Sequence, residues 1–398
     1  MTTLTVIAGT RAERDQTFVD TVCRLADDVA ATHADAVDRE ARFPIEAIDA
    51  LRAHGALSAF VPCALGGGGV SFGALATACL ELGRRCGTSA MVFAMHQIQV
   101  ATMVRHLDDA PWFADYLRDV AAGQRLIASA TSEVGTGGDM RRSVAAVTPA
   151  DGGWLTFEKQ APTVSYGAYA DDVFLTLRRA PEAEPGDQVI VLARAEQTTL
   201  EQMGSWDPLG MRGTCSPGYV VRARIAAEQM LPTPFARVCT ESVVPISHIL
   251  WSHLWLGIAT DAFDRARAFV RASARRQPGT QPPSAQRLSH LMSELSLLRA
   301  ETSSGLADFL AGSEEPGRER LSTMAAVLRF NNLKIAASEQ APRICQGALS
   351  VCGIVGYKND TPYSVGRHLR DSLSACLMVA NERIHQTNAG LLLIAKDV

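Results

Sequence analysis

The sequence lacks several features that would place it in other protein classes. It has no Cys-x-x-Cys pair, no run of about 18 apolar residues, and no cationic start followed by an apolar core. Its 398 residues carry a formal net charge of −4, so nothing indicates a basic surface for nucleic acid or an anionic membrane. Internal repeats and low-complexity segments are also missing. These absences predict a soluble, cytoplasmic protein that binds neither nucleic acid nor membrane.

The nine cysteines are scattered along the chain, which argues against a disulfide framework or a thiolate metal site. Their number is odd, and they stand at Cys23, Cys63, Cys79, Cys86, Cys215, Cys239, Cys345, Cys352 and Cys376. In a chain of this length, such thiols are typical of free, mostly buried residues in a reducing compartment. We therefore expect no metal ion and no cysteine nucleophile.

The pattern of apolar residues changes twice along the chain, which divides it into three parts. Residues 1–122 have apolar residues at helical spacing, interrupted by the glycine run 66–69. Residues 123–237 contain short β-prone runs separated by turn residues, which is typical of an antiparallel sandwich or barrel. Residues 238–398 return to long helical periodicity, with a Pro/Gly-rich interhelical loop at 277–284. We expect a helical domain, a β domain and a helical bundle, in that order.

One short segment near the C-terminus combines glycines with basic residues. A Gly-rich turn precedes a basic helical stretch, and the residues concerned are Gln346, Gly353, Gly356, Tyr357, Pro362, Arg367, Arg370 and Asp371. Exposed backbone N–H groups and arginine side chains brought together in this way can bind a phosphate or pyrophosphate. An ordinary helix–loop–helix connection would give the same pattern, because Gly-rich loops are common.

This segment resembles the C-terminal motif of the acyl-CoA dehydrogenase family, in which a Gln, a Gly-rich turn, a Pro and an Arg-x-x-Arg-Asp lead to the active-site helix. Further blocks in matching order cover nearly the whole chain. The resemblance implies an α+β multidomain fold with an N-terminal helical domain, a middle antiparallel β domain and a C-terminal four-helix bundle. It also implies bound FAD, and a homo-oligomer (dimer or tetramer) in which opposite subunits contact one cofactor.

Two blocks resemble the family's segments along the flavin. In the first, residues 128–139, Ser132 keeps a hydroxyl for the ring, and Gly137 lets the backbone approach a flat ligand. Gly138 stands where relatives carry a Ser that contacts the acyl thioester region, so this position is expected to face the substrate. In the second block, Ser165 or Thr163 is expected to offer a hydroxyl to the flavin edge. A simple corner between two strands remains the alternative for this second block.

Three other blocks extend the resemblance. Phe43-Pro44 and the following glycine run resemble the family's loop near the substrate entrance. The segment 206–216, with Gly210-Met211-Arg212, resembles one that shapes the pocket over the flavin, so we expect Arg212 to contact substrate. Arg275 matches the arginine that binds the cofactor's pyrophosphate across a subunit boundary, together with Gln346, Gly353 and Gly356. A solvated basic helix end is the alternative for Arg275.

The glutamate that removes the substrate's α proton in this family is missing. The two positions where relatives carry it are Val379 and Ser247, and neither can accept a proton. If the final helix begins early, within 374–393, Glu382 lies one turn from Val379 and would be shielded by Leu377, Met378 and Ile384. His96, beside Met95 on a stretch where relatives face the substrate, is a second candidate base, although a lone apolar-helix histidine is more often a core residue. His248, next to Ser247, is also ionisable. Met95 and Val379 are expected to line the substrate pocket.

Three functions follow from the resemblance. The first is FAD-dependent α,β-dehydrogenation of an acyl thioester (CoA or carrier protein), with an electron-transfer flavoprotein or oxygen as electron acceptor. The second is a monooxygenase on the same fold, supplied with reduced flavin by a separate reductase, which needs no α-proton base. The third is a flavin-binding relative without turnover. The missing glutamate and the loss of the thioester-side Ser at Gly138 favour the second, whereas no further substitution marks an oxygenase site.

Overall fold

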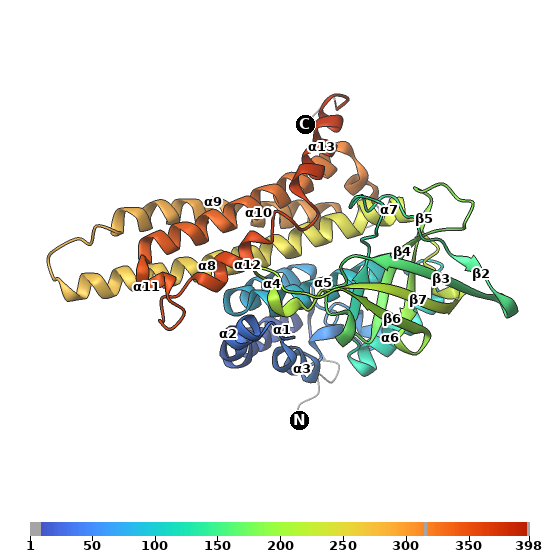
Figure 1. The fold of residues 1–398 in the computed structure, drawn as a ribbon, viewed down its shortest axis with the longest axis horizontal. Coiled ribbons are helices and arrows are strands. Elements are labelled where there is room, and N and C mark those ends of the chain that lie inside the picture. The colour runs from blue at the N-terminus through green and yellow to red at the C-terminus, as the bar shows by residue number, and fades with distance from the viewer. Residues whose placement is uncertain (1–8, 314–316, 396–398) are drawn as a thin grey trace.

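The computed structural model describes residues 9–313 and 317–395, and Figure 1 shows a long helical bundle lying across a group of N-terminal helices and two β sheets. The N-terminal part is helical: α1 (Arg11–Leu25), α2 (Ala31–Glu40), α3 (Ile45–Ala53), α4 (Phe72–Arg85), α5 (Gly87–Arg105) and α6 (Pro111–Gly123). α1 starts at a capping box in which Thr10 and Glu13 bond each other's backbone N–H. α5 is buried on nearly all sides, as expected for a helix that is apolar around its circumference.

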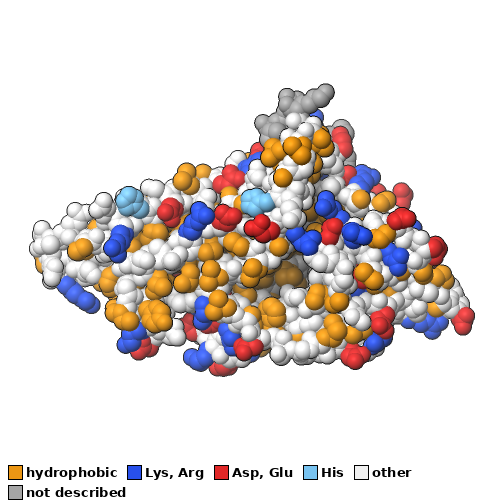
Figure 2. Space-filling view, turned by 45° about the horizontal axis from the view of Figure 1, so that its top comes forward, with side chains coloured by type: hydrophobic (Ala, Val, Ile, Leu, Met, Phe, Trp, Pro, Cys, Tyr) orange, Lys and Arg blue, Asp and Glu red, His pale blue; other side chains and the backbone are white. Residues whose placement is uncertain are grey.

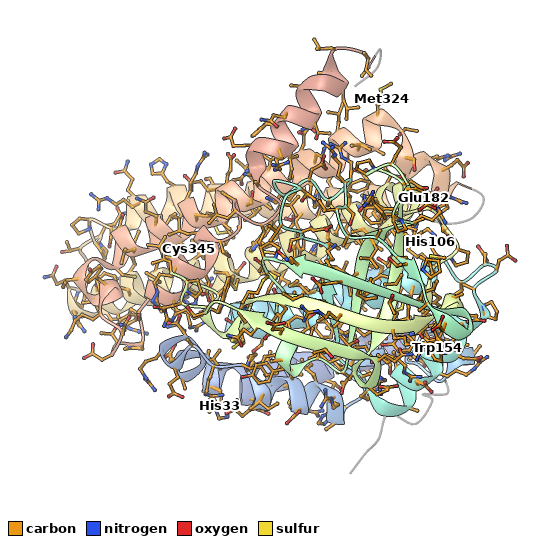
Figure 3. The ribbon with its side chains drawn as sticks, turned by 45° about the vertical axis from the view of Figure 1, so that its right-hand side comes forward. His33, His106, Trp154, Glu182, Met324 and Cys345 are labelled. Atoms are coloured by element: carbon orange, nitrogen blue, oxygen red, sulfur yellow. The ribbon has the colours of Figure 1, made fainter. Side chains whose placement is uncertain are left out.

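Two sheets follow, formed by β1 (Ile127–Ala130), β2 (Thr148–Pro149), β3 (Trp154–Ala161), β4 (Asp172–Arg178), β5 (Gln188–Arg194), β6 (Thr198–Met203) and β7 (Gly218–Ala226). One sheet has the order β1-β4-β5 and the other β2-β3-β7-β6. All pairs are antiparallel except β1–β4, which is parallel. Trp154, at the outer end of β3, lies under the Arg224 guanidinium, 5.1 Å from the ring centroid to Cζ (Figure 3).

The C-terminal part consists of α7 (Phe235–Val238), α8 (Val244–Arg276), α9 (Ala285–Gly312), α10 (Met324–Cys352), α11 (Ile354–Tyr357), α12 (Gly366–Leu373) and α13 (Asn381–Leu392). The continuous helical stretch Phe235–Arg276 is long and apolar enough to cross a membrane, but 89% of its most apolar window is buried inside the protein. It is therefore the core helix of the bundle. The helix–sheet–helix order and the bundle confirm the predicted fold class.

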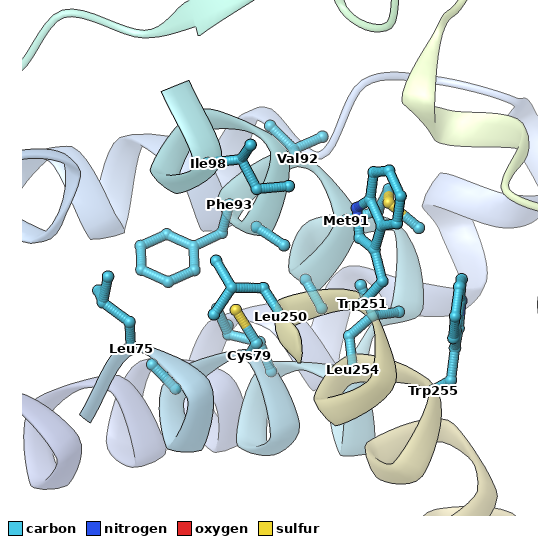
Figure 4. Packing of buried hydrophobic residues seen from close by; sticks show 14 of the residues in the cluster. Leu75, Cys79, Met91, Val92, Phe93, Ile98, Leu250, Trp251, Leu254 and Trp255 are labelled. Atoms are coloured by element: carbon cyan, nitrogen blue, oxygen red, sulfur yellow. The ribbon is translucent and has the colours of Figure 1, made fainter. Parts of the chain in front are cut away.

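The bundle packs tightly on the N-terminal helices because glycines stand where α4 and α8 cross. A Cβ on Gly83 would lie 2.5 Å from the Leu254 carbonyl oxygen, and one on Gly257 would lie 2.2 Å from the Leu80 oxygen. Only glycine permits this approach of the two backbones. Figure 4 shows the side chains that close the contact, contributed by α4, α5 and α8: Leu75, Cys79, Met91, Val92, Phe93, Ile98, Leu250, Trp251, Leu254 and Trp255.

The last helix does not begin early, so the expectation of a helix across 374–393 is wrong. Residues 374–380 form turns, and α13 begins only at Asn381. The break occurs at Val379, which has φ +48, a left-handed conformation that costs a β-branched residue about 1–2 kcal/mol. The buried Lys334 on α10 holds this break, because its ammonium donates to Asn381 Oδ1 at 2.6 Å and lies 3.5 Å from the Val379 oxygen.

All nine cysteines are free, and five of them are buried, as the sequence led us to expect. The five buried thiols are those of Cys79, Cys86, Cys239, Cys345 and Cys352. Burial raises the pKa of the Cys79 thiol well above its usual range and that of Cys352 to about 11. These groups are therefore protonated packing residues at neutral pH.

Candidate active site

A cavity of about 640 Å³ lies where the three parts of the chain meet. Its walls come from α5, from strands β1, β4 and β5, from the start of α8, and from the turns 374–380. On the molecular surface, Figure 2 shows a hollow bordered by hydrophobic side chains between the bundle and the rest of the protein. A second cavity of about 360 Å³ adjoins the first, and the two share Gly138, Met140, Val379 and Arg383.

The main cavity contains several residues that the sequence singled out. These are Met95, Ser132, Gly137, Gly138, Thr163, Ser165, Ser247 and Val379. They come from segments spread over more than half of the chain, and the fold brings them to one place. The alignment of blocks along the flavin segment therefore predicted a real three-dimensional cluster.

The buried carboxylate of Glu133 holds the loop that carries Gly137 and Gly138 through hydrogen bonds. Glu133 accepts hydrogen bonds from Ser143 Oγ at 2.6 Å and from the Ala145 N–H at 2.5 Å. Lys159 Nζ lies 3.6 Å from Glu133 and donates to the Thr176 oxygen at 2.7 Å, directly behind the cavity wall. Burial lowers the pKa of Lys159 to about 8. The loop is thus a fixed part of the site.

Hydroxyl groups form a polar row along one side of the cavity. Ser132 Oγ donates to the Thr163 carbonyl at 3.1 Å. Ser216 Oγ lies 2.9 Å from Ser165 Oγ and 2.8 Å from Thr214 Oγ1, and all three of these residues line the cavity. Such a row can exchange hydrogen bonds with the polar edge of a flat ligand while the apolar walls contact its faces.

Arg212 does not face this cavity, so the expectation that it contacts substrate is wrong. Its guanidinium donates to the Asp38 carbonyl at 3.0 Å and to the Pro208 carbonyl at 2.9 Å, and pairs with Asp207. The arginine fastens its loop to α2, while the neighbouring Met211 lines the cavity. On the other side, the Met211 N–H donates to Asp371 Oδ1 at 2.7 Å. Burial raises the pKa of Asp371 to about 6.

His96 is a core residue, which contradicts its assignment as a catalytic base. Its Nδ1 accepts from the Ile127 N–H at 3.1 Å, so Nε2 carries the proton and donates to the Leu57 oxygen at 2.7 Å. The ring is fully buried, which lowers its pKa to about 4. Both nitrogens are occupied, and neither reaches the cavity.

Glu382 is exposed, so the expectation of a shielded carboxylate base is also wrong. It occupies the first turn of α13 and does not line either cavity, whereas Val379, Ala380 and Arg383 do line the main one. Leu377, which was expected to shield it, is itself 78% exposed. The left-handed turn at Val379 rotates α13 out of the direction that a continuous helix would have taken.

Four expected cofactor residues lie at the far end of the bundle (Figure 1). Arg275 and Gln346 are exposed, Gly353 ends α10 with φ +59, and Gly356 packs against Cys352. From Trp251 in the cavity wall to Arg275, α8 runs 24 residues, or about 36 Å. Within one chain, these residues do not join the cavity.

The sequence did not single out several residues that the cavity contains. Trp206 and Trp251 line it, and their buried indole N–H groups have no hydrogen-bond partner in the described part of the chain. Arg383 also lines it, together with Arg370, which does belong to the Gly-rich and basic segment that the sequence singled out. Among the cavity-lining residues in 9–313 and 317–395, none is Asp, Glu or His. The helical spacing of apolar residues predicts that Trp251 is buried. No pattern in the sequence predicts that its indole N–H has no hydrogen-bond partner.

Comparisons with known proteins agree with the fold described above. Residues 12–124 match the model of the acyl-CoA dehydrogenase N-terminal domain. The chain is 25% identical over 339 residues to the human mitochondrial short-chain specific acyl-CoA dehydrogenase, covering 84% of this chain and 79% of the relative. These matches support its membership of the acyl-CoA dehydrogenase superfamily.

Other relatives in this superfamily have a different chemistry. The chain is 25% identical over 339 residues to the amino sugar nitrososynthase DnmZ of Streptomyces peucetius, covering 82% of this chain and 80% of the relative. The structure of KijD3 in complex with FMN and dTDP-3-amino-2,3,6-trideoxy-4-keto-3-methyl-D-glucose superimposes with a TM-score of 0.82 at 23% identity. That superposition covers 96% of this chain and 95% of KijD3. Membership of the superfamily therefore does not by itself select dehydrogenation.

Proposed function

We propose that this protein is a reduced-flavin-dependent monooxygenase that acts on a small, largely apolar substrate. The observation that carries the proposal is the composition of the main cavity, which has no Asp, Glu or His among its described lining residues. An acyl thioester dehydrogenase needs a base within hydrogen-bond reach of the substrate's α carbon. An oxygenase that receives a reduced flavin needs no such base.

The residues present fit a flavin. A volume of about 640 Å³ suits a flat aromatic ring together with a small substrate. The hydroxyl row of Ser132, Ser165 and Ser216 would supply hydrogen-bond partners to the polar edge of the ring. Gly137 and Gly138, with φ +58 and +85, give a backbone turn without side chains against which such a ring can lie. In the same superfamily, KijD3 was crystallised with FMN.

A bound reduced flavin would supply two electrons to O₂, so that one oxygen atom enters the substrate and the other leaves as water. The chain's own residues create the conditions for this reaction. Met91, Met95 and Ile98 of α5 form an apolar wall, which limits access of water. The free indole N–H groups of Trp206 and Trp251 can donate to an acceptor atom of the substrate and fix its orientation.

Dehydrogenation of an acyl thioester, the first function that the sequence suggested, becomes the second candidate. Similarity to the human short-chain enzyme favours it. The positions that hold the base in relatives are Val379 and Ser247, and both line the cavity without an ionisable group. The two residues that could replace the missing base are not placed to act as one. Glu382 is exposed, and both ring nitrogens of His96 are hydrogen-bonded.

The partners of the proposed enzyme follow from its chemistry. A separate flavin reductase would supply the reduced cofactor. FAD would extend toward Arg275, Gln346 and Gly353 of a second copy, in a dimer or tetramer, whereas FMN would not need them.

The test supplies the purified protein with FMN, NADH and a flavin reductase in air, and follows candidate substrates by mass spectrometry. We expect at least one substrate to gain an oxygen atom only when the protein and reduced flavin are both present. A matched reaction without the reductase is the control. Failure of the protein to bind reduced flavin would refute the proposal.

A further inference from the structure

The smaller cavity has a buried histidine in its wall, which the main cavity does not have among its described lining residues. His248 of α8 lines the smaller cavity and is 3% exposed. Its Nδ1 lies 3.0 Å from the Phe330 carbonyl oxygen, which can only accept, so Nδ1 carries the proton and Nε2 presents a lone pair. Among the described residues, no donor reaches Nε2. His248 is therefore a buried hydrogen-bond acceptor without a donor.

The surroundings of His248 keep its ring neutral. Burial lowers its pKa to about 3, and the nearby Lys334 ammonium acts in the same direction. At neutral pH the ring is thus not a cation. A conjugate acid of that strength also belongs to a very weak base, so His248 can accept a hydrogen bond but is not suited to removing the α proton of a thioester.

A second acceptor without a donor lies on the same side of the smaller cavity. Asn331 of α10 directly follows Phe330, lines this cavity and is buried. Its amide nitrogen donates to Asn388 Oδ1 at 2.7 Å. Asn331 Oδ1 receives no hydrogen bond from any described residue. Two neighbouring helices therefore present acceptor atoms to one cavity.

The charges around the smaller cavity decide which kind of donor fits these acceptors. Arg141 and Arg383 line it, and Asp139 is the one carboxylate among its described lining residues. Arg141 lies 3.5 Å from Asp139, whereas Arg383 has no acceptor among the described residues. The resulting positive potential disfavours an ammonium ion, and an anionic carboxylate has no proton to donate. A neutral hydroxyl group fits, because it donates one hydrogen bond and its oxygen still accepts.

We infer that His248 and Asn331 bind a hydroxyl group of the substrate, an alcohol or a phenol, in the smaller cavity. The His248 ring lies next to Trp251, which lines the main cavity, with 6.3 Å between the ring centroids. One substrate can therefore place an apolar part in the main cavity and its hydroxyl group beside His248. The inference rests on the proposed function and names its substrate class, in which the hydroxyl group orients the molecule and is not the site of oxygen transfer.

Such a site makes a specific prediction about selectivity. A binding site built to pair with a hydroxyl group rejects an analogue that lacks it, because the buried acceptors are then left unpaired. Methylation of the hydroxyl group keeps the oxygen and removes the donor. A hydroxylated compound and its methyl ether therefore differ in the one property that His248 Nε2 and Asn331 Oδ1 can detect.

The experiment compares 2-naphthol with 2-methoxynaphthalene by isothermal titration calorimetry, with FMN present. We expect wild type to bind 2-naphthol at least about tenfold more tightly. His248→Leu should remove this preference without weakening 2-methoxynaphthalene, His248→Gln should keep part of it, and Asn331→Leu should lower it. His253→Leu is the matched control, because His253 is a buried histidine of α8 whose Nδ1 also bonds a backbone carbonyl and which lines neither cavity.

A second measurement uses wild type alone, so it does not depend on the stability of a variant. In protein labelled with ¹⁵N-histidine, the His248 Nε2 resonance should move upfield when 2-naphthol binds and stay in place with 2-methoxynaphthalene. A site that holds only water would leave the resonance unchanged with both compounds. That result, or wild-type affinities within about twofold of each other, would overturn the inference. Both measurements need no turnover, so a hydroxyl preference without any oxygenated product would count against the proposed function alone.

Discussion

The buried Lys334 holds the cavity wall at 374–380, and replacing it with methionine tests how that wall is maintained. The ammonium donates to Asn381 Oδ1, lies 3.5 Å from the Val379 oxygen, and stands 5.9 Å from the Trp255 ring centroid. Lys334→Met keeps most of the side-chain volume and removes these contacts. A hydrogen bond to a charged group contributes about 1.5–3 kcal/mol.

An opposing effect limits the change in global stability. Burial lowers the pKa of Lys334 from 10.5 to about 8, so keeping the ammonium charged at neutral pH costs on the order of 3 kcal/mol. The two effects nearly cancel, and we expect the free energy of unfolding to change by less than about 2 kcal/mol. The local effect does not cancel. The left-handed backbone conformation of Val379 costs about 1–2 kcal/mol, and without the Lys334 contacts nothing would hold the residue in that conformation.

Hydrogen exchange measured by mass spectrometry separates the local effect from the global one. We expect exchange in the 374–380 segment to rise about tenfold in Lys334→Met, since 1.4 kcal/mol corresponds to a factor of ten. Lys358→Met, at an exposed lysine beside Asp360, is the matched control. Wild type should also gain stability relative to the variant between about pH 8 and 10.5, because a depressed lysine pKa favours the folded state as pH rises through that window. Unchanged exchange at 374–380 would refute the role of Lys334.

Three further predictions concern single residues. Gly137→Val should lower flavin affinity at least about tenfold, because the residue has φ +58 and a Cβ would crowd Arg383; unchanged flavin absorbance would show that the turn does not contact the ring. Glu382→Gln should leave flavin binding and turnover within about twofold of wild type, since the exposed side chain does not line the cavity; a loss of about 100-fold or more would restore Glu382 as the base. His96→Phe should lower the free energy of unfolding by about 2–5 kcal/mol, because the Leu57 oxygen and the Ile127 N–H lose their partner; a variant as stable as wild type in urea unfolding would contradict this.

The sequence predicted the fold, and the segments that resemble the family's flavin motifs do meet at one cavity, because both depend on local patterns. Helical spacing, β-prone runs and the glycines at Gly137 and Gly138 are visible in a single chain, and the structure brings them together at the cavity. The order of the blocks then indicated which segments meet.

The sequence could not predict which side chains face the cavity, because that depends on long-range contacts. Arg212 was expected to contact the substrate, but its guanidinium instead donates to the Asp38 carbonyl of α2. His96 looked like a base until the Ile127 N–H fixed its tautomer. The turn at Val379 depends on Lys334 from another helix, and the periodicity of 374–393 contains no sign of it. The free Arg383 follows from the same unpredicted turn.

The most direct measurement of the central claim is an anaerobic titration of the flavin-loaded protein with a panel of acyl thioesters, beginning with butyryl-CoA. The claim is that no residue of the cavity can remove an α proton. We expect the absorbance of the oxidised flavin to stay unchanged with every thioester, while the same protein reduced in advance reoxidises on exposure to air. Bleaching of the flavin by any acyl thioester would contradict the monooxygenase proposal and establish a dehydrogenase whose base lies outside the residues described here.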